Sequence, residues 1–170
     1  MKKRWFAFIL IVIIGFGLTA CNNDSEENVT QKVKDGLSMT ATMQYNGQKM
    51  EALFKKGDSG EYQVEVVSPS YIKGMIFTFK ETGTTVSYMG MTMDLEGDGL
   101  LAATMSKAII SSVNSVASET GISVTAEDKN YIIDGENENG AFQMALDKKS
   151  KLPTHLSIPS LGLECDLKKD

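Results

Sequence analysis

A two-residue hydrophobic period, repeated in short segments, is the feature that most constrains how this chain folds. In "SMTATMQY" at 38–45 every second residue is apolar, and "NG" at 46–47 follows directly. Alternate side chains of an extended strand point to the same face, and Asn-Gly between two such runs is the strongest short signal for a hairpin. The sequence therefore predicts a strand with one apolar face and an antiparallel partner after the turn.

Segments with the same period cover most of the remaining chain. Before residue 96 they are "QKMEALFKK", "EYQVEVV", "MIFTFK" and "TVSYMGMTMDL", and after residue 121 they are "ISVTAE", "NYIIDG", "GAFQMALD", "LPTHLSIP" and "LGLECDL". Short turns such as "GDSG" and "ETGT" separate them, which is typical of consecutive antiparallel strands. We expect a meander of about ten strands. We interpret "TVSYMGMTMDL" as one strand, in which Met89, Met91 and Met93 share a face.

A helical period interrupts the strands once, in "DGLLAATMSKAIISSVNSVASETG". Leu101, Met105 and Ile109 recur at the spacing of one helix face, so the pattern predicts a helix over about 98–119. Asp98 is a suitable N-terminal cap and Gly121 a suitable stop. The other face consists mostly of serine and alanine, which favours a helix that is half covered.

The number of strands indicates how the sheet and the helix are combined. Strand twist accumulates across a large sheet until the sheet curls or closes. A helix with one apolar stripe is expected to lie inside the resulting concavity, where it replaces the side chains that fill a closed barrel. The predicted fold is mainly β (α+β), an incomplete antiparallel barrel with one long helix on its concave face.

The first residues have the pattern of a secretory signal. Lys2, Lys3 and Arg4 precede the apolar run "WFAFILIVIIGFG", and "LTAC" follows, ending at Cys21. This ending resembles the bacterial lipobox. The resemblance implies cleavage before Cys21, a thioether-linked diacylglycerol on its sulfur, and acylation of the new amino terminus by a chain such as palmitate. An uncleaved anchor, or a plain signal with a chance cysteine, is the alternative.

Three segments follow from this interpretation. Residues 1–20 are a lipoprotein signal peptide, 21–33 a lipidated polar tether, and 34–170 a single domain. Two or three acyl chains make a durable anchor, so we expect the protein on the extracytoplasmic face of the cell membrane.

Cleavage also changes the charge balance. Of 17 basic and 22 acidic residues, the signal removes only three basic ones, which leaves a net charge of −8. Such a domain is expected to be repelled by nucleic acid and by anionic lipid headgroups. Cys165 becomes the one thiol outside the anchor, so no intramolecular disulfide is expected. It alternates with leucines, which predicts a buried, inert side chain.

The longest run of strands resembles a known family. "EYQVEVVSPSYIKGMIFTFKETGTTVSYMGMTMDL", with Pro69 near the end of one strand and Gly74 at the start of the next, is similar to the outer-membrane lipoprotein carrier (LolA-like) superfamily. That resemblance implies an unclosed barrel whose concave apolar surface holds acyl chains, with helices as a lid. One predicted helix in place of several, and a permanent anchor, favour a stationary lipoprotein over a shuttling carrier.

The methionines have three possible roles: a copper site, ordinary core, or a flexible lining for an apolar ligand. On a regular strand Met89 and Met93 are about 13 Å apart, too far to share one ion. Methionine fills irregular gaps in cores and also suits promiscuous apolar binding. We predict that a binding site for a lipid or other apolar ligand is lined by Met39, Met43, Met75, Phe77, Phe79, Met89, Met91, Met93, Leu101, Met105 and Ile109.

The remaining motifs give no support to an enzyme. "GDSG" matches the letters around a serine-protease nucleophile, but it connects two strands and is interpreted as a turn. His155 has no second base or metal-ligand spacing near it, and "ENENG" lacks the ligand order of a calcium loop. We expect no catalysis, metal or cofactor. The alternative to ligand binding is an accessory or scaffold lipoprotein with a filled core that docks another cell-envelope protein.

Overall fold

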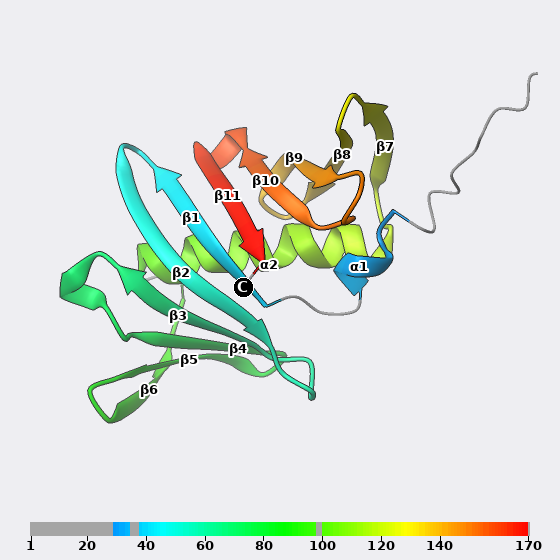
Figure 1. The fold of residues 1–170 in the computed structure, drawn as a ribbon. Helices are drawn as coiled ribbons and strands as arrows, with labels where there is room; N and C mark the ends of the chain where they lie inside the picture. Colours follow the sequence, from blue (N-terminus) through cyan, green and yellow to red (C-terminus); the bar gives the residue numbers. More distant parts are fainter. Residues whose placement is uncertain (1–28, 35–37, 98–99, 170) are drawn as a thin grey trace, which may run out of the picture.

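The computed structural model describes residues 29–34, 38–97 and 100–169, which form one antiparallel sheet around a long helix (Figure 1). The strands are β1 (Met39–Tyr45), β2 (Gln48–Lys56), β3 (Tyr62–Ser68), β4 (Ile76–Lys80), β5 (Gly83–Tyr88), β6 (Met91–Leu95), β7 (Ile122–Glu127), β8 (Asn130–Asn137), β9 (Gly140–Asp147), β10 (Pro153–Ile158) and β11 (Leu163–Lys169). The helix α2 spans Leu101–Ser118. Short 3₁₀ turns η2 (Ser70–Ile72) and η3 (Pro159–Leu161) interrupt two connections.

The strand order is β6-β5-β4-β3-β2-β1-β11-β10-β9-β8-β7. Each half of the sheet is a meander, and pairing of β1 with β11 joins the halves, from Met39 opposite Lys169 to Tyr45 opposite Leu163. The two edge strands of this described sheet, β6 and β7, do not pair with each other, so the barrel stays open. Because α2 connects these two edges, it must cross the concave side of the sheet, as Figure 1 shows. The predicted fold class is confirmed.

Burial follows the predicted alternation. One face of each central strand is fully buried against α2, and Met43, Phe77, Met144 and Leu156 are completely inaccessible. On the helix, Met105, Ile109 and Val116 contribute the expected apolar stripe, with Ala108 and Val113 beside it. Under most of α2 the interior is therefore filled with buried apolar side chains.

Polar contacts fix the position of α2 on the sheet. Tyr62 of β3 donates a hydrogen bond from its hydroxyl to Asn114 Oδ1 over 2.8 Å, and burial raises the pKa of this tyrosine. From the other half of the sheet, Asn137 donates from Nδ2 to Ser112 Oγ over 3.1 Å. The helix is thus held from both sides, which fixes where its first turn lies.

The ends of α2 differ slightly from the prediction. The residue before the helix is Leu100, without a side-chain capping bond. The expected cap, Asp98, lies outside the described residues. The helix ends at Glu119, which adopts a left-handed conformation with φ 54° and donates its N–H to Ser115 and Val116 carbonyls. The C-terminal end of α2 agrees with the predicted range, which ended at 119, although the left-handed residue at this end is Glu119 and the expected stop, Gly121, lies two residues later.

The segment "TVSYMGMTMDL" is two strands, not the single strand predicted. Met89 and Gly90 have φ of 50° and 80° and form a two-residue hairpin turn, which places Tyr88 opposite Met91. Positive φ at both central residues is the geometry that matches the twist of a hairpin. The meander consequently has eleven strands instead of about ten. Asn46 and Gly47, with φ of 46° and 78°, form the hairpin turn that was expected.

Part of the expected tether belongs to the folded domain. Gln31–Lys34 form a single helical turn, α1, and Val29 and Val33 are buried in the core. These two valines, four residues apart, provide an apolar side that packs against the domain. Within the described residues, the core therefore already includes Val29, and the predicted domain boundary at residue 34 stays a prediction.

Candidate apolar binding site

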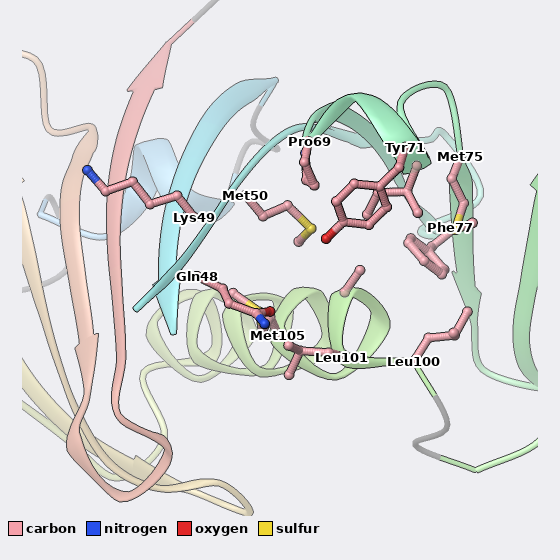
Figure 2. Close-up of a pocket in the computed structure, with 12 residues that line it drawn as sticks. Gln48, Lys49, Met50, Pro69, Tyr71, Met75, Phe77, Leu100, Leu101 and Met105 are labelled. Carbon is pink, nitrogen blue, oxygen red and sulfur yellow. The ribbon is translucent and has the colours of Figure 1, made fainter. Parts of the chain in front are cut away.

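One cavity opens at the N-terminal end of α2, between the helix, β2, β4 and the β3–β4 connection (Figure 2). Its volume is about 190 Å³. The lining residues are Gln48, Lys49, Met50, Pro69, Tyr71, Ile72, Met75, Phe77, Leu100, Leu101, Ala102 and Met105. Pro69 and Tyr71 stand on one side and Leu101 and Met105 on the other, so the first turn of α2 forms one wall.

The β3–β4 connection creates the opposite wall because it leaves the sheet and returns to it. Val66 accepts a hydrogen bond from Gly74 over 2.8 Å and donates one to the Met75 carbonyl over 2.9 Å. The intervening residues, including η2, project from the sheet toward α2. Gly74 has φ 81°, a conformation that costs glycine little, and this allows the sharp return into β4.

The chemistry of the cavity is apolar and soft. Three thioethers, from Met50, Met75 and Met105, surround it with the Phe77 ring. Tyr71 is 74% exposed and directs its hydroxyl toward the cavity in Figure 2, whereas the Lys49 ammonium points away. No charged group of the described lining is therefore directed inward, which suits an uncharged aliphatic or aromatic group.

The eleven residues predicted to line a ligand occupy three kinds of position. Met75, Phe77, Leu101 and Met105 line the cavity. Met39, Met43 and Ile109 are buried in the core, and Phe79 is partly buried against it; none of these four borders the cavity. Met89, Met91 and Met93 are 80%, 63% and 59% exposed.

The methionine run therefore does not form one surface. Met89 belongs to the hairpin turn, and only Met91 and Met93 lie on a strand. Met93 pairs with Val86, which pairs with Phe77, so these two methionines stand on the concave face in line with the cavity. They extend the apolar concave face to the sheet edge, beyond the part that α2 covers.

Several lining residues were missed by the sequence prediction. Met50 alternates with other apolar residues of β2, and this signal was available. Pro69, Tyr71 and Ile72 belong to "SPSYIKG", which has no strand or helix period and looks like an ordinary connection. Its one distinguishing feature in the sequence is an aromatic residue, Tyr71, within a short connection.

The "GDSG" turn and the buried Cys165 are as predicted, whereas His155 has two carboxylates beside it that the sequence did not indicate. Gly57–Gly60 is a turn, with a hydrogen bond from the Gly60 N–H to the Gly57 carbonyl. His155 is partly exposed, with Nδ1 2.9 Å from Asp166 Oδ1 and Nε2 3.0 Å from Glu164 Oε2. Cys165 is buried, and burial, with the Asp166 charge second, raises its pKa to about 12. Its thiol is therefore protonated at neutral pH and is not a nucleophile.

Three further observations bear on anchoring and metals. Within residues 29–34, 38–97 and 100–169, no group of three His, Cys, Asp or Glu side chains is arranged to hold a metal ion. In the same part of the chain, no helix combines the length and apolar character needed to cross a bilayer. The predicted signal peptide, Cys21 and the first part of the predicted tether lie outside the described residues.

Comparison with known proteins gives similarity of structure only. No protein-family model and no curated protein matches the chain. An uncharacterized conserved protein from Thermus thermophilus is 12% identical, with a TM-score of 0.48 over 85% of this chain and 86% of that one. A chain from the complex of the CwlD amidase with the GerS lipoprotein of Clostridioides difficile is 12% identical, with a TM-score of 0.47 over 84% and 88%.

A LolA superfamily protein from Nitrosomonas europaea is 7% identical, with a TM-score of 0.39 over 78% of this chain and 70% of that one. A structure from the LolA-like superfamily is thus among the matches, and the resemblance predicted from the sequence is confirmed. At these identities it is a likeness of fold.

Proposed function

We propose that this protein is a membrane-anchored extracytoplasmic lipoprotein that binds a lipid or other apolar ligand at the concave face of its sheet. The observation that carries the proposal is the apolar cavity at the start of α2 and its continuity with exposed apolar side chains. Tyr71, Leu100 and Leu101 line the cavity and are also exposed, so its entrance is itself apolar. Exposed apolar surface of this kind commonly marks a binding site.

The size of the cavity limits what enters it. A cavity of about 150 Å³ lined by apolar side chains takes up benzene, so about 190 Å³ accommodates one ring or one end of an aliphatic chain. Complete drug-sized ligands occupy about 300–1,000 Å³. A lipid would therefore insert only a chain end, and the rest of it would lie on the exposed concave face beside Met91 and Met93.

Anchoring would occur through acylated Cys21. The core already includes Val29, so the connecting residues 22–28 reach at most about 25 Å when extended. The domain would therefore stay close to the membrane surface. The thioethers at the cavity suit a site that accepts related ligands of varied shape, because methionine side chains adapt to what they contact.

A matched pair of substitutions on α2 tests ligand binding. Ala102 lines the cavity, whereas Ala117 is also partly buried against the core but lies near the far end of the helix. Ala102→Phe should fill the cavity and weaken binding of a fluorescent fatty acid by about tenfold or more, while Ala117→Phe should change it little. Equal binding by both variants, or no binding by the unsubstituted chain, would contradict the proposal.

The second candidate is an accessory lipoprotein that docks another envelope protein. It is favoured by the filled interior under most of α2, where Met43, Ile109 and Met144 are completely buried. In that case fatty acid should not bind, and pull-down from detergent-solubilised membranes should recover a stoichiometric partner. Lysine substitution at Glu61, Gln63 and Glu65 should abolish its recovery if it docks on the outer face at the start of β3.

A further inference from the structure

Six lysines gather at one end of the sheet, although they come from three separate segments. They lie in the β7–β8 turn, in the β9–β10 turn and at the end of β11, and we name them the lysine cluster: Lys129, Lys148, Lys149, Lys151, Lys168 and Lys169. The Lys148 N–H donates to the Lys129 carbonyl over 2.9 Å, which joins the two turns. The antiparallel pairing of β10 with β11 places the start of β10 beside the end of β11.

The charges of the lysine cluster face solvent. Lys129, Lys149, Lys168 and Lys169 are exposed. Lys148 and Lys151 hold their ammonium groups 5.6 and 3.9 Å from the centre of the Tyr131 ring, a cation–π arrangement that keeps both at the surface. Within the part of the chain that the structure describes, no carboxylate forms an ion pair with any of the six.

Five carboxylates lie within two residues of the lysine cluster in sequence: Glu127, Asp128, Asp147, Asp166 and Asp170. The Asp147 carboxylate already accepts hydrogen bonds from the Ser150 N–H and hydroxyl, at 2.7 and 2.8 Å. These bonds are the largest cause of its lowered pKa, so it remains ionised. Six lysines against five carboxylates leave this end with an excess of one positive charge, in a domain whose net charge is negative. One of the five, Asp166, lies 2.9 Å from His155 Nδ1.

The lysine cluster lies where the N-terminal segment joins the sheet. The segment of α1 leads through residues 35–37 into β1, whose first residue, Met39, pairs with Lys169. The last residue of β1, Tyr45, pairs with Gln48, which lines the cavity. Seven residues of strand separate the two places, so the lysine cluster and the cavity entrance are about 20 Å apart, at opposite ends of β1.

We propose that the lysine cluster binds anionic lipid headgroups of the membrane to which the chain is anchored, and so holds the cavity entrance away from that membrane. The proposal rests on anchoring through Cys21. Net charge predicts repulsion, but a surface contact depends on the charges within about 8 Å of it at physiological salt. Each lysine close to an anionic leaflet favours the contact by about fivefold. The ligand site would then open toward the space beyond the bilayer.

Lysine acetylation on vesicles tests the orientation with the acylated chain itself. The chain is reconstituted on phosphatidylcholine vesicles with and without phosphatidylglycerol, treated with an acetylating ester, and analysed by mass spectrometry. On anionic vesicles Lys149 and Lys169 should react about fivefold more slowly than on neutral ones. The control residues are two lysines outside the lysine cluster. Lys73 follows η2, and Lys107 of α2 is close enough to Glu138 of the β8–β9 turn for its charge to act on it. Each control lysine should react at the same rate on anionic and on neutral vesicles. About 1 M salt should remove the difference.

Matched variants give the control. Lys149→Gln with Lys169→Gln should reduce the protection of Lys129 and Lys168, whereas Lys73→Gln with Lys107→Gln, an equal change in net charge, should not. The proposed orientation would be overturned if neither the lysine cluster nor Lys73 and Lys107 were protected from acetylation. It would also be overturned if Lys73 and Lys107 were protected and the lysine cluster were not. Flotation with neutral vesicles reports on the anchor alone. A chain that fails to float overturns both the proposed anchoring and the proposed orientation. A chain that floats but whose lysine cluster is not protected from acetylation overturns only the orientation.

Discussion

Thr30 donates a hydrogen bond from Oγ1 to Glu119 Oε1 over 2.6 Å, and this bond joins the beginning of the described chain to the C-terminal end of α2. The cavity lies at the other end of the same helix. Because α2 has 18 residues, the two features are about 27 Å apart. The helix thus acts as a spacer between the segment that leads to the anchor and the proposed ligand site.

Removal of this bond should loosen α1 without affecting the cavity. Thr30 is buried, so Thr30→Val keeps the shape of the side chain but leaves Glu119 without this donor. We expect the free energy of unfolding to fall by about 1 kcal/mol. Urea unfolding measures it, with the exposed Thr125→Val as the matched control. Equal values for the two variants would show that the bond does not stabilise the fold.

Tyr71 should matter for ligand binding and not for stability. Its ring is exposed and makes one side of the cavity entrance. Tyr71→Ala should weaken fatty-acid binding by about fivefold and change the free energy of unfolding by less than about 0.5 kcal/mol. Tyr71→Phe keeps the ring and should retain most of the affinity. A large loss of stability in Tyr71→Ala would assign the residue to the fold instead.

The β5–β6 turn should be improved by asparagine. Met89 has φ 50°, which is unfavourable for a methionine and well tolerated by asparagine before glycine. Met89→Asn should therefore raise the free energy of unfolding by about 0.5–1 kcal/mol. The control is Met91→Asn. Because Met91 lies on strand β6, asparagine there should not raise the free energy of unfolding. A lower melting temperature for Met89→Asn than for the unsubstituted chain would argue against the turn.

Gly135 should resist substitution because Phe142 occupies the space of a side chain there. An added Cβ at Gly135 would meet the Phe142 ring, and the two residues are direct partners across β8 and β9. Gly135→Ala should cost about 1–3 kcal/mol. In the Phe142→Leu background the same substitution should cost clearly less. A double-mutant cycle by urea unfolding measures this coupling, and additive effects would contradict the packing.

Cys165 should make the protein less stable above about pH 9. The folded thiol has a pKa raised to about 12, whereas an unfolded one ionises near its ordinary value of 9.0. Between these values the folded state binds more protons, so the free energy of unfolding falls as the pH rises. Urea unfolding from about pH 8 to 11 should show a steeper decline for the unsubstituted chain than for Cys165→Ala. Parallel curves would mean that the thiol is not buried.

Hydrophobic periods of two residues for the strands and of a helical turn for α2 were sufficient to predict the sheet and the helix that lies on it. Met43, Phe77 and Leu156 are buried because the strand period is two and register is fixed wherever one face is covered. The turn at Met89 was missed because methionine is a poor residue for positive φ, so the local sequence there resembles a continuous strand. Gly90 was the only sign of the turn.

The cavity and the lysine cluster depend on contacts that a local pattern does not contain. The cavity exists because η2 and the first turn of α2 approach each other from opposite sides of Phe77, and their meeting depends on how α2 is held by Tyr62 and Ser112. The lysines of the β9–β10 turn and of β11 are mixed with acidic residues along the chain. They gather only because β10 and β11 pair.

The pairing of β1 with β11 also determines when this protein finishes folding. The first strand lies in the middle of the sheet, and its second neighbour is the last strand, more than a hundred residues later. Contacts between residues so far apart in sequence form slowly. Until β11 arrives, β1 has an open edge, and such an edge invites pairing with other chains. The nascent protein therefore remains vulnerable to aggregation until β11 has been made, and a chain without β11 would lose the junction between its two halves.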